Sequence, residues 1–447
     1  MNDAYRARLR SADEAAALVR DRDVILLPLA PAQPTGLLRA LGRRDGFSEL
    51  RLICALLQER FALLERPGVH VVSQFFGHVE RALRAEGVPI DHLTSDFHGL
   101  ELIAQREQPR IVASATAPPD EDGYLSFGVH AGASELPFFA AARDPQRLAI
   151  AEVNAHMPAT RGLPAFGDHR IHCSQVDVIV EHDGPLQELS GKQRGDADRR
   201  IAEHASTLVQ DGATLQFGIG GVPNEIAKIL ADGPRGDFGI HTEMLVDGVK
   251  LLHDAGKVRN QKGIYDGHSV CTFALGTRAL YDWAGREPSL RFLPVSATNL
   301  PSLIIRNRRM ISVNAAIMID LAGQVVADTV AGRQHSGVGG HESFVCGARE
   351  AEGGASILCL HATATVHGER RARIVAELPP GSVVTTPRHQ VQWVATENGI
   401  ANLFGRSQRE RAECLIALAD PDHRDELRAA ARARSSSPGA AIPRERS

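Results

Sequence analysis

The sequence lacks any apolar run of the roughly 18 residues that a membrane-spanning helix requires. Its amino-terminal stretch, MNDAYRARLRSADEAAALVRDRD, carries acidic residues and has no apolar core of the kind found in secretory signals. The net charge of −4 provides no basic surface for nucleic acid. These absences predict a cytoplasmic protein that binds neither membranes nor nucleic acid.

Cysteine is scarce, with six residues in 447, and no two of them form a CxxC pair. Most lie inside apolar runs, so we expect free, buried thiols in a reducing compartment. The chain also has no HExxH motif, and His241 and Glu243 have no third ligand at a sensible spacing. The sequence therefore predicts no metal site.

Two common catalytic signatures are missing as well. The chain has no GxSxG elbow, so an activated serine nucleophile is not indicated. Its first glycine-rich turn has Pro223 where the dinucleotide-binding pattern GxGxxG requires glycine. A nicotinamide-dependent oxidoreductase is therefore disfavoured.

Short β-branched runs alternate with helical patterns along the chain, which is typical of an α/β protein. Most of the runs are continuously apolar, as the buried strands of parallel sheets are. Strands are expected at 23–28, 69–73, 110–113, 148–153, 176–180, 214–217, 270–274, 303–305, 311–313, 325–328, 356–360 and 383–386. Helices are expected at 35–41, 135–142, 197–209, 224–231 and 407–418.

The length exceeds what a single hydrophobic core serves, so at least two domains are expected. Residues 184–198, GPLQELSGKQRGDAD, are polar and rich in turn formers. They divide an amino-terminal α/β domain (1–190) from a carboxyl-terminal one (197–428). Residues 429–447 hold few large apolar side chains and are expected to form a disordered tail.

The segment LQFGIGGVPN (215–224) reads as a strand that enters a glycine turn and then a helix. Glycines let the backbone approach a ligand closely, and the free N–H groups at the start of a helix favour an anion. A tight turn without a ligand is the alternative. A second segment, FGIHTEMLVDG (238–248), places Glu243 between two apolar runs, where it is either a functional acid or an ordinary acid at a helix start.

Two later segments carry further candidates. QHSGVGGHESF (334–344) is a glycine loop whose N–H groups can form an oxyanion hole, although it can also be a plain loop. Its histidines, His335 and His341, are either polar loop residues or bases. In VTTPR, Arg388 is either a contact for an anionic ligand or a partner in a structural ion pair.

Together these segments resemble the acetyl-CoA hydrolase/transferase family, within the family I CoA-transferases and especially their 4-hydroxybutyrate CoA-transferase branch. The similarity runs through most of the chain and includes PPDEDGYLSFG, AEVNAHMP, VDVIVEHDGPLQEL, VNAAIMIDLAGQVVAD and VATENGIANLFGRSQRERAECL. It implies two open α/β domains with mostly parallel sheets, an active site between them, and a homodimer. It also implies that acyl-CoA and a small carboxylate are the substrates, with no tightly bound cofactor.

The resemblance also assigns roles to residues. Glu243 is expected to form a covalent glutamyl-CoA thioester. Backbone donors over the active site are expected from Gly337, Gly339 and Gly340. CoA contacts are expected from Gly220, Gly221, Val222, Pro223 and Asn224. Departures from the family pattern at Asn314-Ala315-Ala316, His341, Glu342, His361 and Asn398 leave the acyl group open.

A carboxylate suits this chemistry because its reference pKa of about 4.3 leaves it ionised at pH 7 without a general base. Attack on the thioester gives a mixed anhydride and then glutamyl-CoA, so ping-pong kinetics are expected. An acyl-CoA hydrolase with the same nucleophile is the main alternative. A non-catalytic CoA-binding protein is a further one, which the retention of Glu243 beside both glycine loops disfavours.

Overall fold

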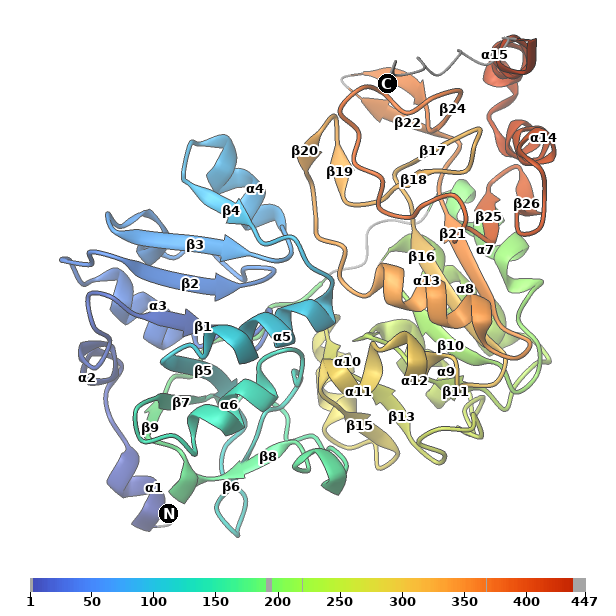
Figure 1. Cartoon of the computed structure of the whole chain (residues 1–447). Coiled ribbons are helices and arrows are strands. Elements are labelled where there is room, and N and C mark those ends of the chain that lie inside the picture. The colour runs from blue at the N-terminus through green and yellow to red at the C-terminus, as the bar shows by residue number, and fades with distance from the viewer. Residues whose placement is uncertain (1–2, 190–194, 219, 367, 437–447) are drawn as a thin grey trace, which may run out of the picture.

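Two mostly parallel β-sheets carry the fold, one in each half of the chain (Figure 1). The computed structural model describes residues 3–189, 195–218, 220–366 and 368–436. The expected fold class, two open α/β units with mostly parallel sheets, is confirmed.

The amino-terminal half is built on a seven-stranded sheet in the order β4-β3-β2-β1-β5-β7-β9, and all its neighbouring strands are parallel. These strands are β1 (Val24–Leu26), β2 (Leu50–Cys54), β3 (Val69–Ser73), β4 (Ile90–His92), β5 (Ile111–Thr116), β7 (Leu148–Val153) and β9 (Val178–Glu181). A short antiparallel pair joins β6 (Tyr124–Ser126) and β8 (Arg170–His172). The helices are α1 (Asp3–Arg8), α2 (Ala12–Ala17), α3 (Thr35–Gly42), α4 (His78–Ala85), α5 (Phe97–Glu107) and α6 (Glu135–Ala141), with 3₁₀ turns η1 (Ala62–Glu65), η2 (Pro164–Phe166) and η3 (Cys173–Gln175).

The carboxyl-terminal half contains a six-stranded sheet in the order β11-β10-β16-β21-β25-β26, in which only β26 runs antiparallel to its neighbour. Its strands are β10 (Thr214–Phe217), β11 (Gly239–Ile240), β16 (Met310–Ala315), β21 (Ala355–Cys359), β25 (Trp393–Thr396) and β26 (Gly399–Asn402). Smaller sheets use β12 (Met244–Leu245), β13 (Ser269–Cys271), β14 (Phe273–Ala274), β15 (Leu290–Phe292), β17 (Met318–Asp320), β18 (Val325–Val326), β19 (Thr329–Val330), β20 (Arg333–Gln334), β22 (Thr363–Val366), β23 (Glu369–Ala372) and β24 (Ile374–Val375).

The helices of this half begin with α7 (Asp196–Ser206), α8 (Gly221–Asp232) and α9 (Asp247–Asp254). The others are α10 (Arg278–Ala284), α11 (Val295–Thr298), α12 (Pro301–Ile304), α13 (His341–Glu350), α14 (Gln408–Leu418), η4 (Pro421–His423) and α15 (Arg424–Ser436). The β19–β20 hairpin approaches the α4 side of the amino-terminal half (Figure 1).

In each main sheet, the strand order reverses at one strand, so that the strands that follow in sequence lie on both sides of it. In the first sheet, β1 lies between β2 and β5, and in the second, β10 lies between β11 and β16. The loops that follow adjacent strands diverge at such a point and leave a crevice at the carboxyl edge. The arrowheads of β2 and β3 point toward the other half of the molecule (Figure 1), so this edge faces the second sheet.

The two halves share main-chain hydrogen bonds as well as apolar contacts. The N–H groups of Ala131 and Gly132 both donate to the carbonyl of Thr272, at 2.9 and 3.0 Å, and Ala274 N–H donates to the Val129 carbonyl at 2.8 Å. The largest apolar cluster contains buried side chains from both halves. This shared core fixes the carboxyl edges of the two sheets against each other.

Several expectations about individual elements are corrected. Residues 303–305 were expected to form a strand, but they belong to or follow α12, which starts at Pro301, a residue suited to the first turn of a helix. Residues 383–386 form no strand, and only Thr386 makes an isolated bridge to Val325. Of the strand expected at 325–328, only Val325–Val326 is present as β18.

The expected disordered tail is helical in its first part, because α15 extends through Ser436. That run is rich in alanine and arginine, which are strong helix formers. Residues 437–447 lie outside the described residues, as do residues 190–194 of the expected domain boundary.

Thr272 provides a test of the shared interface. Its buried hydroxyl accepts the N–H of Gly132 at 3.0 Å. We expect Thr272→Val to lower the free energy of unfolding by about 1 kcal/mol, because one acceptor is lost while the carbonyl remains. The matched change Thr365→Val, on the exposed face of β22, should alter it by less than about 0.5 kcal/mol. Denaturant unfolding measures both, and equal effects would contradict this role.

Candidate active site

Glu243 lies just beyond β11, at the carboxyl edge of the second sheet, and is only partly exposed. Its main chain is fixed because its carbonyl accepts N–H groups from Thr272 at 2.9 Å and Phe273 at 3.2 Å. Thr272 is also the residue that binds the amino-terminal half. The backbone of Glu243 is therefore held at the boundary between the two halves.

The Glu243 carboxylate receives two hydrogen bonds. The side-chain amide of Asn299, a fully buried residue that follows α11, donates to Oε2. The backbone N–H of Gly340 also donates to the carboxylate. Gly340 is the N-cap of α13, so the carboxylate lies at the amino end of that helix, where the dipole favours negative charge.

Opposing effects set the pKa of Glu243. Burial raises it most, and the nearby negative charge of Asp96 raises it further. The hydrogen bonds from Asn299 and Gly340 lower it, but the net result is a pKa of about 7. The expectation of full ionisation at pH 7 is therefore corrected, because only about half of the carboxyl groups are ionised there.

The glycine loop 337–340 packs closely on both Glu243 and the amino-terminal half. A Cβ atom at Gly340 would overlap Oε2 of Glu243, and one at Gly339 would lie 3.4 Å from Oε1. A Cβ at Gly337 would collide with the carbonyl of Gln74 and lie 3.0 Å from the Phe75 ring. Only glycine fits positions 337 and 340 without displacing these neighbours.

A main-chain bond ties the same loop to the first sheet. Phe97 N–H, at the start of α5, donates to the carbonyl of Gly339 at 3.0 Å. Arg81 reaches from α4 and donates to the carbonyl of His335 at 2.6 Å. The loop is thus held between the two halves directly beside Glu243.

The first glycine loop occupies the same sheet edge, one strand further along. Gly220 has a φ of 130°, and α8 begins at Gly221. A Cβ at Gly221 would collide with the carboxylate of Asp198, which also pairs with His361 Nε2 at 2.9 Å. Residues 220–224 thus share the crevice edge with Glu243 but pack mainly on α7 and α9, and their contact with CoA stays a prediction.

The histidines near Glu243 have structural contacts. His241 is fully buried, its Nε2 bonds to the carbonyl of Thr298 at 2.8 Å, and burial lowers its pKa to about 3. His341 Nε2 bonds to Thr386 Oγ1 at 2.8 Å, and burial lowers its pKa to about 4. The backbone N–H of His335 donates to the Asp328 carbonyl at 2.8 Å. For His335 and His341, these contacts favour a role as polar structural residues over a role as catalytic bases.

Arg388 is exposed and forms no ion pair with any residue that the structure describes. Its carbonyl accepts a hydrogen bond from the Arg411 side chain at 2.6 Å. The structural ion pair considered for Arg388 is therefore absent from the described part of the chain, and its contact with an anionic ligand stays a prediction.

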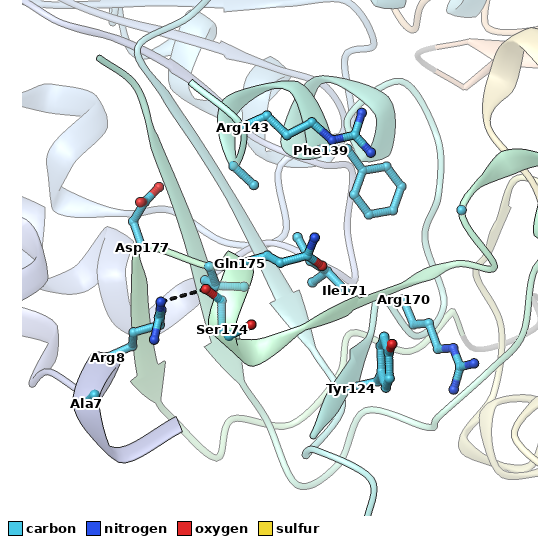
Figure 2. Close-up of a pocket in the computed structure, with 13 residues that line it drawn as sticks. Ala7, Arg8, Tyr124, Phe139, Arg143, Arg170, Ile171, Ser174, Gln175 and Asp177 are labelled. Carbon is cyan, nitrogen blue, oxygen red and sulfur yellow. Dashed lines mark hydrogen bonds between the residues drawn. The ribbon is translucent and has the colours of Figure 1, made fainter. Parts of the chain in front are cut away.

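The cavities of the protein differ in their relation to Glu243. Figure 2 shows one of about 620 Å³ in the amino-terminal half, where Arg8 donates to the Ser174 carbonyl at 2.6 Å and Arg170 lies 4.4 Å from the Tyr124 ring centre. It opens beside the amino end of β9, at the opposite edge of the sheet from the crevice. A second cavity, of about 930 Å³, lies between α4 and the β19–β20 hairpin, beside the glycine loop.

The cysteines, the potential metal ligands and the apolar helices bear on other expectations. All six cysteines are free, and four are buried. No three His, Cys, Asp or Glu side chains within the described residues come together in a way that could hold a metal ion. None of the helices in the described ranges combines the length and the apolar character needed to span a bilayer.

Sequence reasoning missed the residues that complete the site from other segments. Asn299 lies in no glycine motif, and nothing in SATNLPSL distinguishes it from an ordinary helix cap. Phe75 and Asp96 belong to the amino-terminal half, far from Glu243 in sequence. One usable signal was the place of Phe75 two residues after the strand expected at 69–73, since the carboxyl ends of parallel strands meet at one edge. Asp96 follows β4, which was not among the expected strands.

The chain is similar to known proteins over nearly its whole length. Residues 276–431 match the acetyl-CoA hydrolase/transferase C-terminal domain. The chain is 33% identical to the 4-hydroxybutyrate coenzyme A transferase of Clostridium kluyveri, over 95% of this chain and 97% of that protein. It is 35% identical to the succinyl-CoA:cyclohexane-1-carboxylate CoA transferase of Geobacter metallireducens, over 96% of each. The crystal structure of RipA from Yersinia pestis superimposes with a TM-score of 0.89 at 33% identity, covering 97% of this chain and all of that one.

Gly340 offers a direct test of the geometry around the carboxylate. Its φ of −93° suits any residue, so the clash of an added Cβ with the side chains of Glu243 and Asn299 is what opposes substitution. We expect Gly340→Ala to lower the free energy of unfolding by about 1–3 kcal/mol through overpacking. Gly195→Ala, at an N-cap with no atom within 4 Å of the added Cβ, should change it far less. A crystal structure of Gly340→Ala with an unmoved Glu243 would contradict the close contact.

Proposed function

The chain belongs to the acetyl-CoA hydrolase/transferase family of CoA-transferring enzymes, and we propose that it uses Glu243 as a covalent nucleophile. Its substrates are short acyl-CoA thioesters and small carboxylates such as acetate, butyrate or 4-hydroxybutyrate. One observation carries this proposal. The Glu243 carboxylate lies between the Asn299 amide and the Gly340 N–H, at the boundary between the two halves of the chain.

The first half-reaction begins with attack of the Glu243 carboxylate on the acyl-CoA carbonyl carbon. The tetrahedral adduct collapses, the C–S bond breaks, and the CoA thiolate leaves an acyl-glutamyl anhydride. The thiolate then attacks the glutamyl carbonyl carbon and displaces the first acid as its carboxylate. The product is a glutamyl-CoA thioester, and no proton need be transferred in either step.

The second half-reaction reverses these steps with a new acid. The acceptor carboxylate attacks the glutamyl-CoA carbonyl and releases the CoA thiolate. The thiolate then attacks the acyl carbonyl of the new anhydride, which frees Glu243 and forms the product acyl-CoA. Each product leaves before the next substrate enters, so the kinetics are ping-pong.

The hydrogen bonds that hold the carboxylate also suit the reaction. Attack on the glutamyl carbonyl places negative charge on one of its oxygens, beside the Asn299 amide and the Gly340 N–H. Both donors are in place before the charge develops, which is how an oxyanion hole lowers a barrier. The amino end of α13 adds a favourable dipole.

Two further features support the proposal. The 220–224 loop lies along the same sheet edge as Glu243, so we expect it to contact CoA. Binding energy from the remote parts of CoA can then be expressed at the reacting carbon. The packed glycine loop limits the access of water, which would hydrolyse the anhydride and the thioester. Water exclusion favours transfer over the alternative of acyl-CoA hydrolysis. A homodimer remains a prediction from the family.

The covalent intermediate can be trapped. We expect incubation with acetyl-CoA followed by sodium borohydride to reduce a single residue, Glu243, to its alcohol, because the thioester is reducible and a free carboxylate is not. Peptide mass mapping locates the change. Glu243→Gln should lose acyl transfer by about 10³-fold or more, as removal of a covalent nucleophile does.

Glu101 provides the matched control, since it is also a buried glutamate whose burial raises its pKa to about 7. Glu101→Gln should keep the borohydride modification at Glu243. Modification of another residue, or undiminished CoA-transfer activity of Glu243→Gln, would contradict the assignment of Glu243 as the nucleophile. Product release measured with and without acetate separates transfer from hydrolysis.

The raised pKa of Glu243 predicts a specific pH dependence. Only the carboxylate attacks the thioester, so the rate of glutamyl-CoA formation should rise with pH and reach half its plateau near pH 7. An ordinary glutamate would reach the plateau below about pH 6. Single-turnover rates between pH 5 and 9 measure this. A rate that is flat from pH 5.5 upward would contradict the burial of the nucleophile.

A further inference from the structure

The space beside Glu243 is bordered by aromatic side chains from both halves. The partly exposed ring of Phe75 lies across the glycine loop, 3.6 Å from a Cβ placed on Gly339, whose own neighbour is Oε1 of Glu243. The rings of Phe97 and Phe273, which are both buried, meet edge to face at 5.9 Å across the boundary between the halves. Phe273 also donates its N–H to the Glu243 carbonyl. An aromatic ring from the amino-terminal half therefore lies beside the loop that holds the Glu243 carboxylate.

The charges near Glu243 are negative. Within the described residues, the Glu243 carboxylate pairs with no Arg, Lys or His side chain. Asp96, the N-cap of α5, lies next to Phe97, whose N–H binds Gly339, and its negative charge acts on Glu243.

The arginines of the neighbouring cavity have other contacts. Arg81 donates to the carbonyls of Phe76 and His335 at 3.1 and 2.6 Å, and Arg84 lies over the Phe76 ring at 5.6 Å. Their placement beside Phe76 gives the approach to the crevice positive charge, which favours the arrival of anionic substrates. Neither side chain pairs with Glu243, so neither neutralises charge at the nucleophile itself.

We infer that the acyl subsite selects acids with a single carboxylate and rejects dicarboxylic acids, with Phe75 as its apolar wall and Asp96 as its repelling charge. This inference rests on the proposed function and narrows its substrate class. The reacting carboxylate is consumed in the bond to Glu243, whereas a second carboxylate would stay charged among aromatic rings. It would be desolvated there without a cation and would face Asp96.

Family membership alone does not decide this point. The relatives include a 4-hydroxybutyrate coenzyme A transferase and a succinyl-CoA:cyclohexane-1-carboxylate CoA transferase, at 33% and 35% identity. The succinyl group has a second carboxylate, whereas 4-hydroxybutyrate and cyclohexane-1-carboxylate have none. The residues around Glu243 in this chain therefore carry the distinction, and the uncharged acyl group fits them.

The first experiment compares acceptors of equal carbon number, butyrate and succinate, with acetyl-CoA as donor. We expect kcat/KM for butyrate to exceed that for succinate on the order of 100-fold, because like charges in contact disfavour the wrong partner. Equal values for the two acids would overturn the inference while leaving Glu243 chemistry intact. Absence of transfer to any acid would instead remove the proposed function.

Two variants locate the discrimination. Asp96→Asn and Asp96→Ser remove the charge but keep an N-cap acceptor for the Gly99 N–H, which Asp96 holds at 2.6 Å. With both variants, the ratio of kcat/KM for butyrate to kcat/KM for succinate should fall by about tenfold. Asp91→Asn, an equal charge change at an exposed residue of β4, should leave the ratio unchanged. A loss of rate with both acids at a constant ratio would mean that Asp96 acts only as a helix cap and would overturn its role here.

Phe75→Ala tests the wall independently of charge. Removal of the ring should raise kcat/KM for hexanoate relative to butyrate by about tenfold, since added methylenes gain contact in the enlarged space. Succinate should remain a poor acceptor because Asp96 is still present. An unchanged preference between butyrate and hexanoate would place the acyl chain elsewhere and remove Phe75 from the subsite.

Discussion

The hydrogen bonds from Gly340 and Asn299 to the Glu243 carboxylate are the interaction on which the rest of the site depends. A carboxylate in a buried crevice loses hydration, and this loss favours the protonated form. Two fixed donors and the amino end of α13 offset part of that cost. The pKa of about 7 expresses the balance, with the group poised between a protonated acid and an available nucleophile.

This interaction constrains the surrounding chain. The Gly340 N–H can reach the carboxylate only if no side chain separates them, and Gly337 must likewise pass over the Gln74 carbonyl. The loop is fixed from the other side by the Phe97 N–H. The glycines, the start of α13 and the carboxyl edge of the first sheet thus form one packed unit. The apolar cluster shared by both halves keeps that unit in register.

The sequence predicted those parts of the protein in which local pattern and structure coincide. Continuous apolar runs correctly predicted strands such as β3 and β7, because strands covered on both faces need no polar alternation. The motif resemblance singled out Glu243 and the 337–340 loop, which the structure brings into contact, although its assigned roles stay predictions. Asn299, Phe75 and Asp96 were missed since each becomes relevant only through tertiary packing. The strand expected at 303–305 was wrong for a local reason, because the helix start at Pro301 outweighed the β-branched residues of this run.

In our proposals, the groups that react and the groups that select the acid come from different halves of the chain. Glu243, the proposed nucleophile, and the donors that bind it, Asn299 and Gly340, all come from the carboxyl-terminal half. Phe75 and Asp96 approach the same point from loops of the amino-terminal half, where side chains can change without moving the donors. In the proposed mechanism, transfer passes through the same anhydride and thioester for every acid, so a family can keep one set of donors and vary the facing side chains. Similarity over the whole chain then indicates the type of reaction, whereas we expect the acid to depend on a few residues of the amino-terminal half that face Glu243.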